Sequence, residues 1–451
     1  MDAFDRFVLA VIAALLVGIG VVLALGDHVG APVVAYSPAE GDRPAITAPI
    51  RVTFGQRMEA ASAEARFALA PPVTGAFSWE GNTLVFTPEQ ALAPGETYTA
   101  TLDAGAQSSA GRRTLETLSW SFTPRYPRVL YLSAPLDEGA VRSLWAASLD
   151  GGAPARLFAP DYGVYSFAPS PDGSQIAVSV QTATPAVDVW LLDADGANPR
   201  LLIDCAPDAC LGVAWSPDGQ TLAYELSRQG SAPSRIWLYD MATRETGPVF
   251  EDDQILGYAP TWSADGKRLA FFDSNAEAIR VLDLDTGDVA VVPTLMGEVG
   301  DFAPDGSAMV YTEIRRLGRQ FLPELWLADL KPGGGLAPLL DAGEDDAAAA
   351  WSPDGQWIAF GRHRLDDGSS SWVAGRQAML YHVETGELRP LTDDVNYNNT
   401  AFAWDPTGQF LLIQRFRLDE AYALPQLWVY DMKRGEMRQL ATEGILGRWQ
   451  P

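Results

Sequence analysis

Acidic side chains recur in the sequence at a period of about 46 residues, in short segments that also carry turn residues. Carboxylates gathered around one opening concentrate cations and bind basic peptides through charge-assisted hydrogen bonds. Such a ring would bind a cation or a basic peptide directly. The predicted ligand-binding members of this acidic ring are Asp161, Asp252, Asp253, Asp345, Asp346, Asp393 and Asp394.

Two alternatives to ligand binding stay open, because arginines occur in neighbouring segments and could bridge the acids. Those arginines are Arg228, Arg315, Arg316, Arg319, Arg362, Arg364, Arg376, Arg415 and Arg417. Mutual salt bridging is the first alternative, and plain solvation of the carboxylates is the second. If the ring does hold a cofactor, Ca²⁺ is the one that carboxylate oxygens favour.

Other residue types that do chemistry are scarce, since the chain has three histidines and two cysteines. Zinc sites and histidine-dependent catalysis are therefore disfavoured. The stretch LDLDTGD, with Asp283, Asp285 and Asp288, does not continue to the sixth-position glycine and the distal glutamate of an EF-hand loop, so turn chemistry explains it. We expect no metal site and no catalytic residues.

Cys205 and Cys210 lie in one short loop, DCAPDACLG. In an oxidising compartment they could close a small disulfide ring, and otherwise they are two unpaired thiols. A metal site is disfavoured because no histidine or further cysteine lies near them in the sequence.

The chain of 451 residues has room for two to four domains, and its formal net charge is −26. A surface of this charge repels phosphate backbones, which excludes nucleic acid as an expected partner. The glycine and proline content, 41 and 32 residues, indicates many turns.

Residues 7–26 are apolar and uncharged, and a helix of that length spans the hydrocarbon core of a bilayer. We expect an uncleaved single-pass anchor, with a cleaved secretory signal as the alternative. Arg6 before the segment and Asp27 after it place the rest of the chain on the extracytoplasmic side. Residues 1–30 are therefore assigned to this membrane segment, and both alternatives deliver the remainder to the same compartment.

Residues 31–125 contain short alternating stretches separated by turns, which is typical of a small β-sandwich. The order of its motifs resembles the bacterial immunoglobulin-like domain of SbsA-type surface-layer proteins. The motifs are Tyr36-Ser37-Pro38, VTFGQRM, Leu84–Pro88, Leu92-Ala93-Pro94-Gly95 with Tyr98, and Trp120–Thr123. The resemblance implies a spacer or adhesion module, and Trp79, Trp120 and Phe122 are expected to pack its core.

Residues 126–451 are dominated by a repeat with two markers. The first marker is a strand that ends in an aromatic residue and is followed by a tight turn, as in Trp215-Ser216-Pro217-Asp218-Gly219, and it occurs in six complete copies. The second marker is a later strand of "Leu-Trp" type, and it occurs in seven copies. The C-terminal stretch 444–450 supplies the missing strand of the blade that begins at 128. We therefore predict a propeller of seven four-stranded blades closed by this strand, with six blades as the alternative.

The repeat W-S-P-D-G-x-x-[IL]-[AV], with its "L-W-x-x-D" partner, resembles the propeller of the TolB family over about 325 residues. That family more often has six blades, which weakens the transfer of any particular partner. Related propellers cap prolyl oligopeptidase-type peptidases, but the sequence has no Gly-x-Ser-x-Gly elbow, and no hydrolase domain follows residue 451. A peptidase is therefore disfavoured.

The expected fold class is all-β: an Ig-like sandwich and a seven-bladed propeller behind one transmembrane helix. The expected function is a membrane-anchored, extracytoplasmic binding or scaffold protein that engages a protein, a peptide or a component of the cell envelope. The alternatives are a carboxylate-dependent hydrolase or lyase at the channel mouth and a purely structural envelope protein.

Overall fold

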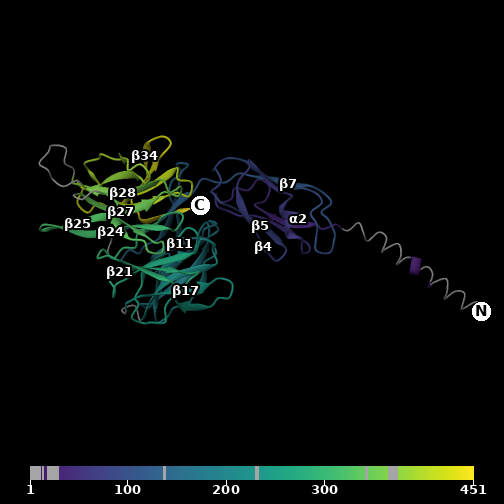
Figure 1. Ribbon diagram of the computed structural model, residues 1–451, viewed down its shortest axis with the longest axis horizontal. Helices are drawn as coiled ribbons and strands as arrows, with labels where there is room; N and C mark the ends of the chain where they lie inside the picture. The colour runs from purple at the N-terminus through teal and green to yellow at the C-terminus, as the bar shows by residue number, and fades with distance from the viewer. Residues whose placement is uncertain are drawn as a thin grey trace, which may run out of the picture. The chain divides into compact units, whose positions relative to one another are not determined.

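The computed structural model describes residues 12, 15–17, 30–135, 139–228, 233–340, 344–363 and 374–451 (Figure 1). Within those ranges no helix combines the length and the apolarity needed to cross a bilayer. The predicted anchor at residues 7–26 lies outside the described residues, apart from residues 12 and 15–17.

The chain divides into two compact units. One holds the described residues up to Pro44 together with Ala48–Arg125, and the other holds Ala45–Thr47 together with Tyr126–Pro451.

The first unit is a two-sheet sandwich with one short helix, α2 (Ala60–Glu64). One sheet has the order β1-β2-β5-β4 and the other β3-β6-β7. Its strands are β1 (Val33–Ser37), β2 (Ile50–Phe54), β3 (Phe67–Ala70), β4 (Gly75–Glu80), β5 (Thr83–Pro88), β6 (Tyr98–Leu102) and β7 (Leu118–Phe122).

The sandwich core follows from alternation along its strands. In β2 every second residue, Ile50, Val52 and Phe54, is buried. Trp120 is also buried in this core, whereas Trp79 is only partly buried and its indole N–H donates to Glu64 Oε1 at 2.8 Å. Trp120 therefore packs in the core as predicted, whereas Trp79 packs against it only in part and also forms a hydrogen bond.

The second unit is a β-propeller, and its described strands form seven four-stranded blades. Blade 1 contains β8 (Arg128–Leu132), β9 (Leu144–Ser148), β10 (Ala155–Phe158) and β35 (Ile445–Gln450); blade 2 contains β11 (Val164–Pro169), β12 (Gln175–Gln181), β13 (Val187–Asp193) and β14 (Arg200–Ile203). Blade 3 contains β15 (Ala209–Trp215), β16 (Thr221–Ser227), β17 (Arg235–Asp240) and β18 (Thr246–Pro248); blade 4 contains β19 (Tyr258–Trp262), β20 (Arg268–Asp273), β21 (Ala278–Asp283) and β22 (Val289–Pro293). Blade 5 contains β23 (Asp301–Phe302), β24 (Ala308–Leu317), β25 (Gln320–Asp329) and β26 (Leu336–Pro338). Blade 6 contains β27 (Asp345–Trp351), β28 (Trp357–His363), β29 (Gln377–His382) and β30 (Leu388–Pro390); blade 7 contains β31 (Tyr397–Trp404), β32 (Phe410–Arg417), β33 (Gln426–Asp431) and β34 (Glu436–Ala441).

This arrangement confirms the predicted all-β architecture of an Ig-like sandwich followed by a propeller. Blade 1 is completed from both ends of the propeller sequence, because β35 pairs antiparallel with β8. The side chains of Arg128 and Gln450 hydrogen-bond to each other, 322 residues apart in sequence, and both donate to the carbonyl oxygen of Ala194 in blade 2. Closure therefore also links blade 1 to its neighbour.

The repeated turn has a built-in hydrogen-bond pattern. In blade 3 the hydroxyl of Ser216 donates to Asp218 Oδ1 at 2.5 Å, and the amide of Gly219 donates to the Ser216 carbonyl at 2.9 Å. Gly219 has φ of 70°, a conformation that glycine adopts without steric cost. Blades 2, 4 and 6 repeat the serine-to-aspartate contact.

Neighbouring blades are joined by a second repeated contact, made by the marker tryptophan at the end of the inner strand. Its indole N–H donates to a backbone carbonyl in the inner strand of the preceding blade, at 2.9 to 3.2 Å. The pairs are Trp215 with Ala168, Trp262 with Ala214, Trp404 with Ala350, and Trp449 with Ala403.

Blade 5 departs from this pattern because Phe302 replaces the tryptophan. In blade 6 the indole of Trp351 donates instead to the Gly355 carbonyl of its own blade, at 3.2 Å. The backbone amide of Trp351 donates to the carboxylate of Asp301 in blade 5 at 2.7 Å. At this junction a backbone amide and a carboxylate therefore form the contact that an indole and a carbonyl form at the four junctions above.

Replacing Trp449 with Ala is expected to lower the free energy of unfolding of the propeller by about 3–5 kcal/mol, because it empties the buried space beside Phe410 and removes the bond to Ala403. Urea denaturation followed by near-UV circular dichroism measures this. Phe321→Ala, at a largely exposed aromatic residue, is the control and should leave the transition midpoint unchanged. Equal midpoints for Trp449→Ala and the control would contradict the closing role of β35.

Candidate functional site

The propeller has two faces of different character. The Ser-Pro-Asp-Gly turns and the turns between third and fourth strands lie on one, which we call the turn face. The links from the outer strand of one blade to the inner strand of the next, and the loops between second and third strands, lie on the other, which we call the loop face.

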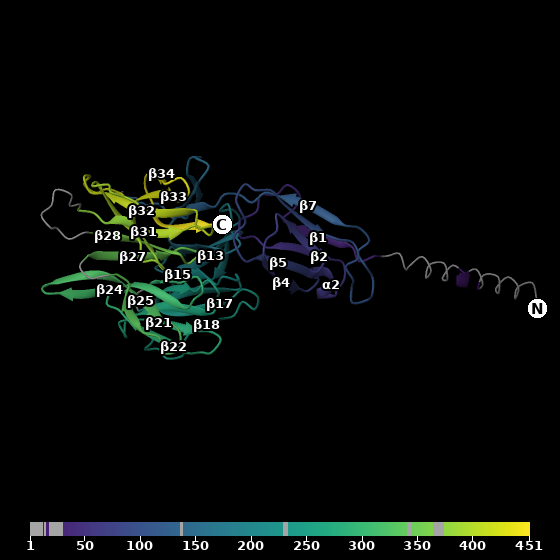
Figure 2. The same ribbon diagram turned by 45° about the horizontal axis from the view of Figure 1, so that its top comes forward.

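The longest regular projection of the loop face is the hairpin of β24 and β25, whose two strands pair over ten residues each (Figure 2). β23 pairs with only two residues of β24, and β26 with three of β25, so the distal half of the hairpin extends past its blade. Its tip carries exposed Arg315, Arg316 and Arg319, and a Phe321 ring that is 67% exposed.

All seven acids of the predicted ring are described, and two of them begin β27. Asp346 is buried, and the guanidinium of Arg362 donates to both of its oxygens at 2.7 Å. Asp345 accepts two hydrogen bonds from Arg376, at 2.9 and 2.7 Å, and lies 3.6 Å from His363 Nδ1. These two acids are therefore engaged by cations of the same blade.

Burial disfavours the charged form of both members of the Asp346–Arg362 pair. Burial raises the pKa of Asp346 above its usual range, while the hydrogen bonds and charge of Arg362 oppose that rise. Burial alone would lower the pKa of Arg362, but the bound carboxylate reverses the direction and the pKa is raised. Removing either partner leaves the other charge buried without compensation.

Asp394 belongs to a second ionic cluster, in blade 7. Its carboxylate lies 3.2 Å from Arg415, a residue with 1% side-chain exposure. The Arg415 guanidinium is 3.7 Å from the ring centroid of Tyr397 and 5.3 Å from that of Trp428, which is cation–π geometry. Burial lowers the pKa of Arg415, and the charge of Asp394 opposes that shift.

The other four acids, Asp161, Asp252, Asp253 and Asp393, are exposed. Asp252 and Asp253 accept hydrogen bonds from Gln254, each at 2.9 Å. In the described ranges no group of three or more histidine, cysteine or acidic side chains is placed to hold a metal ion. The structure thus brings Asp345, Asp346 and Asp394 to arginines and leaves four acids facing water.

Arg362→Ala is expected to lower the free energy of unfolding by about 3–5 kcal/mol, because it leaves the Asp346 carboxylate buried and unpaired. The double variant Arg362→Leu with Asp346→Leu removes both charges and should recover most of that loss. Thermal denaturation of both variants measures the difference. A double variant no more stable than Arg362→Ala would show that the pair contributes through packing alone.

Two charged residues of the inner strands were missed by sequence reasoning. At the position before the marker residue the blades carry Ala168, Ala214, Thr261, Asp301, Ala350, Ala403 and Arg448. Five of these are small and uncharged. Asp301 and Arg448 therefore depart from the pattern that the aligned repeats show in the sequence. Inner strands surround the axis of a propeller, so both charges lie beside the central channel.

The two channel charges differ in their contacts. Asp301 accepts the Trp351 amide, and burial raises its pKa to about 6. Arg448 is exposed, yet desolvation by the surrounding protein lowers its pKa. No other described residue forms a hydrogen bond or an ion pair with its guanidinium.

The raised pKa of Asp301 makes stability depend on pH. The folded state holds this proton more tightly than the unfolded chain, so its contribution is complete below about pH 4 and is lost as pH rises through about 6. Asp301→Asn should remove this slope: relative to the wild type it gains about 3 kcal/mol at pH 8 and nothing at pH 4. Urea midpoints between pH 4 and 8 measure this, and parallel profiles for both proteins would contradict it.

Exposed large apolar side chains are distributed unevenly between the two faces. In the described part of the propeller, those in loop-face loops, or in the first two positions of strands that leave them, are Val141, Tyr162, Tyr165, Leu295, Phe321, Val395, Leu418, Tyr422 and Leu446. By the same criterion the described part of the opposite face contributes Leu201, Leu284, Leu336 and Leu388, none of which is aromatic. Tyr422 is 89% exposed, in the loop between β32 and β33. Aromatic residues of this kind are enriched in protein–protein interfaces.

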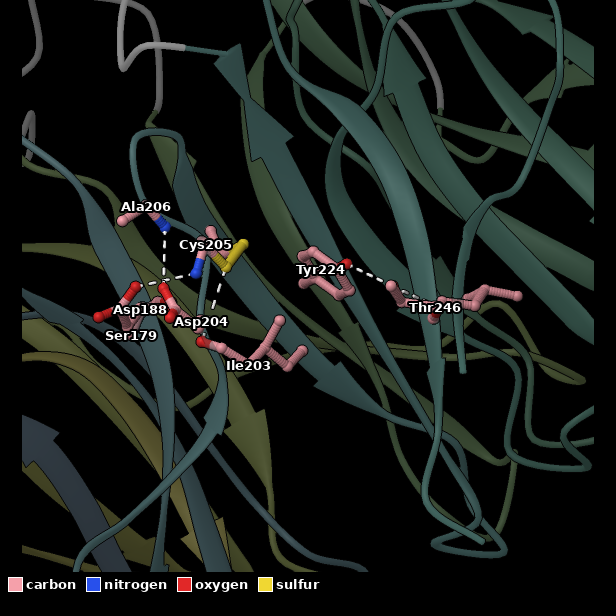
Figure 3. Close-up of a disulfide and its surroundings, with 11 residues drawn as sticks. Ser179, Asp188, Ile203, Asp204, Cys205, Ala206, Tyr224 and Thr246 are labelled. Carbon is pink, nitrogen blue, oxygen red and sulfur yellow. Dashed lines mark hydrogen bonds between the residues drawn. A yellow bond between two sulfur atoms is a disulfide. The ribbon is translucent and has the colours of Figure 1, made fainter. Parts of the chain in front are cut away.

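Cys205 and Cys210 are joined by a disulfide in the link between blades 2 and 3 (Figure 3). Asp188 of β13 accepts the backbone amide of Cys205 at 2.9 Å, which ties this link to blade 2. Both cysteines are buried in the core between the two blades. The cysteines are therefore structural parts of the loop face.

Comparison with known proteins identifies the class of the first unit directly. Residues 27–124 match the family model of the bacterial Ig-like domain, Big_5. The propeller has TolB-like structural neighbours, among them TolB from Acinetobacter baumannii, with a TM-score of 0.44 and 18% identity over 88% of this chain and 86% of that one. An oligogalacturonate lyase in complex with manganese is similar with a TM-score of 0.48 and 19% identity, over 70% of this chain and 86% of that one. The chain thus combines a bacterial Ig-like domain with a propeller that has TolB-like neighbours, as predicted.

Sequence relatives include dipeptidyl-peptidase 5 of Porphyromonas endodontalis, 25% identical over 54% of this chain and 36% of that protein. The uncharacterized peptidase YuxL of Bacillus subtilis is 27% identical over 35% of this chain and 22% of that protein. This chain matches only about a third or less of the length of these two peptidases.

Proposed function

We propose that this chain is a binding or scaffold protein whose loop face engages a protein or another component of the cell envelope. The observation that carries the proposal is the distribution of exposed large apolar side chains in the described propeller: nine lie on that face, four of them aromatic, against four on the other face, none of them aromatic. Variable loops on a rigid scaffold are where binding commonly occurs, and exposed aromatic side chains supply most of the binding energy of typical interfaces.

The charges of the loop face support selective recognition. Acids in blades 6 and 7 are held by arginines, whereas Asp161, Asp252, Asp253 and Asp393 face water and the tip of the β24–β25 hairpin is basic. A partner must therefore match an apolar surface with both acidic and basic positions. Such a pattern steers encounter and fixes the register of the bound partner.

A carboxylate-dependent hydrolase or lyase is less well supported. Such an enzyme needs two carboxylates over a common pocket, one of them with a raised pKa. Asp346 has a raised pKa, but both of its oxygens accept hydrogen bonds from Arg362. Asp301 also has a raised pKa, and we find no second described carboxylate in contact with it. We therefore propose that the chain is not an enzyme.

The proposal includes the location of the chain in the cell. The uncharged segment 7–26 would anchor the chain, with the Ig-like domain and the propeller on the extracytoplasmic side. The disulfide of the loop face is consistent with an oxidising compartment.

The double variant Phe321→Ala with Tyr422→Ala should reduce recovery of the partner at least tenfold after chemical crosslinking in native membranes, because it removes two exposed aromatic contacts without disturbing a core. Mass spectrometry of the crosslinked product identifies and quantifies the partner. The matched control is Leu284→Ala, at an exposed residue of the turn face, which should leave recovery unchanged. Equal recovery by the wild type and the double variant would refute the loop face as the binding surface.

A further inference from the structure

A hollow of about 390 Å³ opens on the loop face between blades 3 and 4. This volume is in the lower part of the range for small-molecule sites. Its apolar wall is formed by Leu226, Pro233 and Leu256, and its polar lining by the set Arg228, Arg235, Asp253, Gln254 and Asn275. Trp237 of β17 completes the lining.

Trp237 is a member of the repeated "Leu-Trp" marker, whose tryptophans Trp145, Trp326 and Trp428 are half-buried. The equivalent indole N–H groups of Trp145 and Trp326 are buried without a hydrogen-bond partner, and that of Trp428 donates to Gln426 at 3.0 Å. Trp237 is half-buried and lines the hollow. Trp237, which is half-buried like its counterparts, therefore borders a cavity whose lining also carries polar side chains.

The polar wall of the hollow is fixed in place by its own hydrogen bonds. Arg235 donates to the backbone carbonyls of Phe250 and Asp252. The side-chain amide of Asn275 donates to the Gln254 carbonyl at 2.8 Å, and the Asn275 backbone amide donates to Asp273 at 3.0 Å. The link between blades 3 and 4 is thereby tied to both blades before any ligand arrives.

Several polar groups of the hollow have hydrogen-bonding capacity to spare. No described residue pairs with the guanidinium of Arg228. Asp253 is exposed and accepts one hydrogen bond, from Gln254. Together these groups offer donors and acceptors at the rim of an apolar pocket with an aromatic wall.

We propose that this hollow binds a saccharide, with one sugar ring against Trp237 and its hydroxyl groups bonded to Arg228, Asp253 and Asn275. A sugar ring has an apolar C–H face and a rim of hydroxyls that both donate and accept, which matches an indole beside carboxylate, amide and guanidinium groups. The inference rests on the proposed binding function and narrows its envelope component to a glycan at this position.

A peptide is the main competing occupant. An extended peptide presents a row of backbone groups and favours a long groove or a free strand edge. The hollow is short, and its polar groups come from side chains on two blades, so a compact polyhydroxylated ring fits it better.

The test uses the full-length chain, purified in a detergent without a sugar headgroup, and titrates three trisaccharides by isothermal calorimetry: maltotriose, tri-N-acetylchitotriose and trigalacturonate. At least one is expected to bind with Kd below about 1 mM. Asn275→Ala, at an exposed residue, should weaken that binding at least tenfold, and Trp237→Ala should do the same while Trp237→Phe retains most of it. Asn396→Ala, at an exposed asparagine of the link between blades 6 and 7, is the matched control and should bind as the wild type does.

Absence of binding for all three sugars up to about 10 mM overturns the inference, as does binding that Asn275→Ala leaves unchanged. Asn275→Ala decides the outcome even if Trp237→Ala does not fold. Partner recovery by crosslinking is measured separately, so a hollow that binds no sugar beside an intact loop-face interaction overturns this inference and leaves the proposed function standing.

Discussion

The propeller depends on how each blade is fastened to the next. Blades are separate sheets, with the exception of blades 2 and 3, which share one parallel bridge, so the ring is held by packing between their faces and by the few polar contacts that cross them. The marker tryptophans supply both kinds of contact, because the indole packs between blades while its N–H donates to a backbone carbonyl of the preceding blade. The pairing of β35 with β8 makes this arrangement continuous around the ring.

This fastening explains why the two faces of the ring differ. The turn face is built from the residues that set the blade geometry, such as Ser216, Asp218 and Gly219, whose side chains and backbone are occupied with each other. The segments of the loop face do not set the blade geometry, so they vary in length and in charge. The long β24–β25 hairpin, the ionic clusters of blades 6 and 7 and the hollow beside Trp237 all lie there.

Most of the architecture could be predicted from the sequence, because each blade repeats the same pattern of strands and turns. Turn glycines, alternating strands and the two markers led to seven blades and to closure by the C-terminal strand, and both are present in the structure. The partners of the acids could not be read in the same way. Asp346 and Arg362 are 16 residues apart, and only the register of β27 against β28 makes them neighbours. Asp301 and Arg448 were detectable as departures from small residues at one repeat position, whereas the hollow beside Trp237 could not be predicted from the marker.

The pairing of β35 with β8 also bears on the order in which the propeller forms. Arg128 and Gln450 meet across 322 residues of sequence, so blade 1 lacks its inner strand until the other six blades have been made. The entropy of closing so long a loop must be overcome before this contact forms, whereas blades 2 to 7 each assemble from contiguous sequence. During synthesis the free edge of β8 is open to other strands, and completion of the ring removes it. The ring therefore closes only after the other six blades are available, because closure requires β35 to pair with β8.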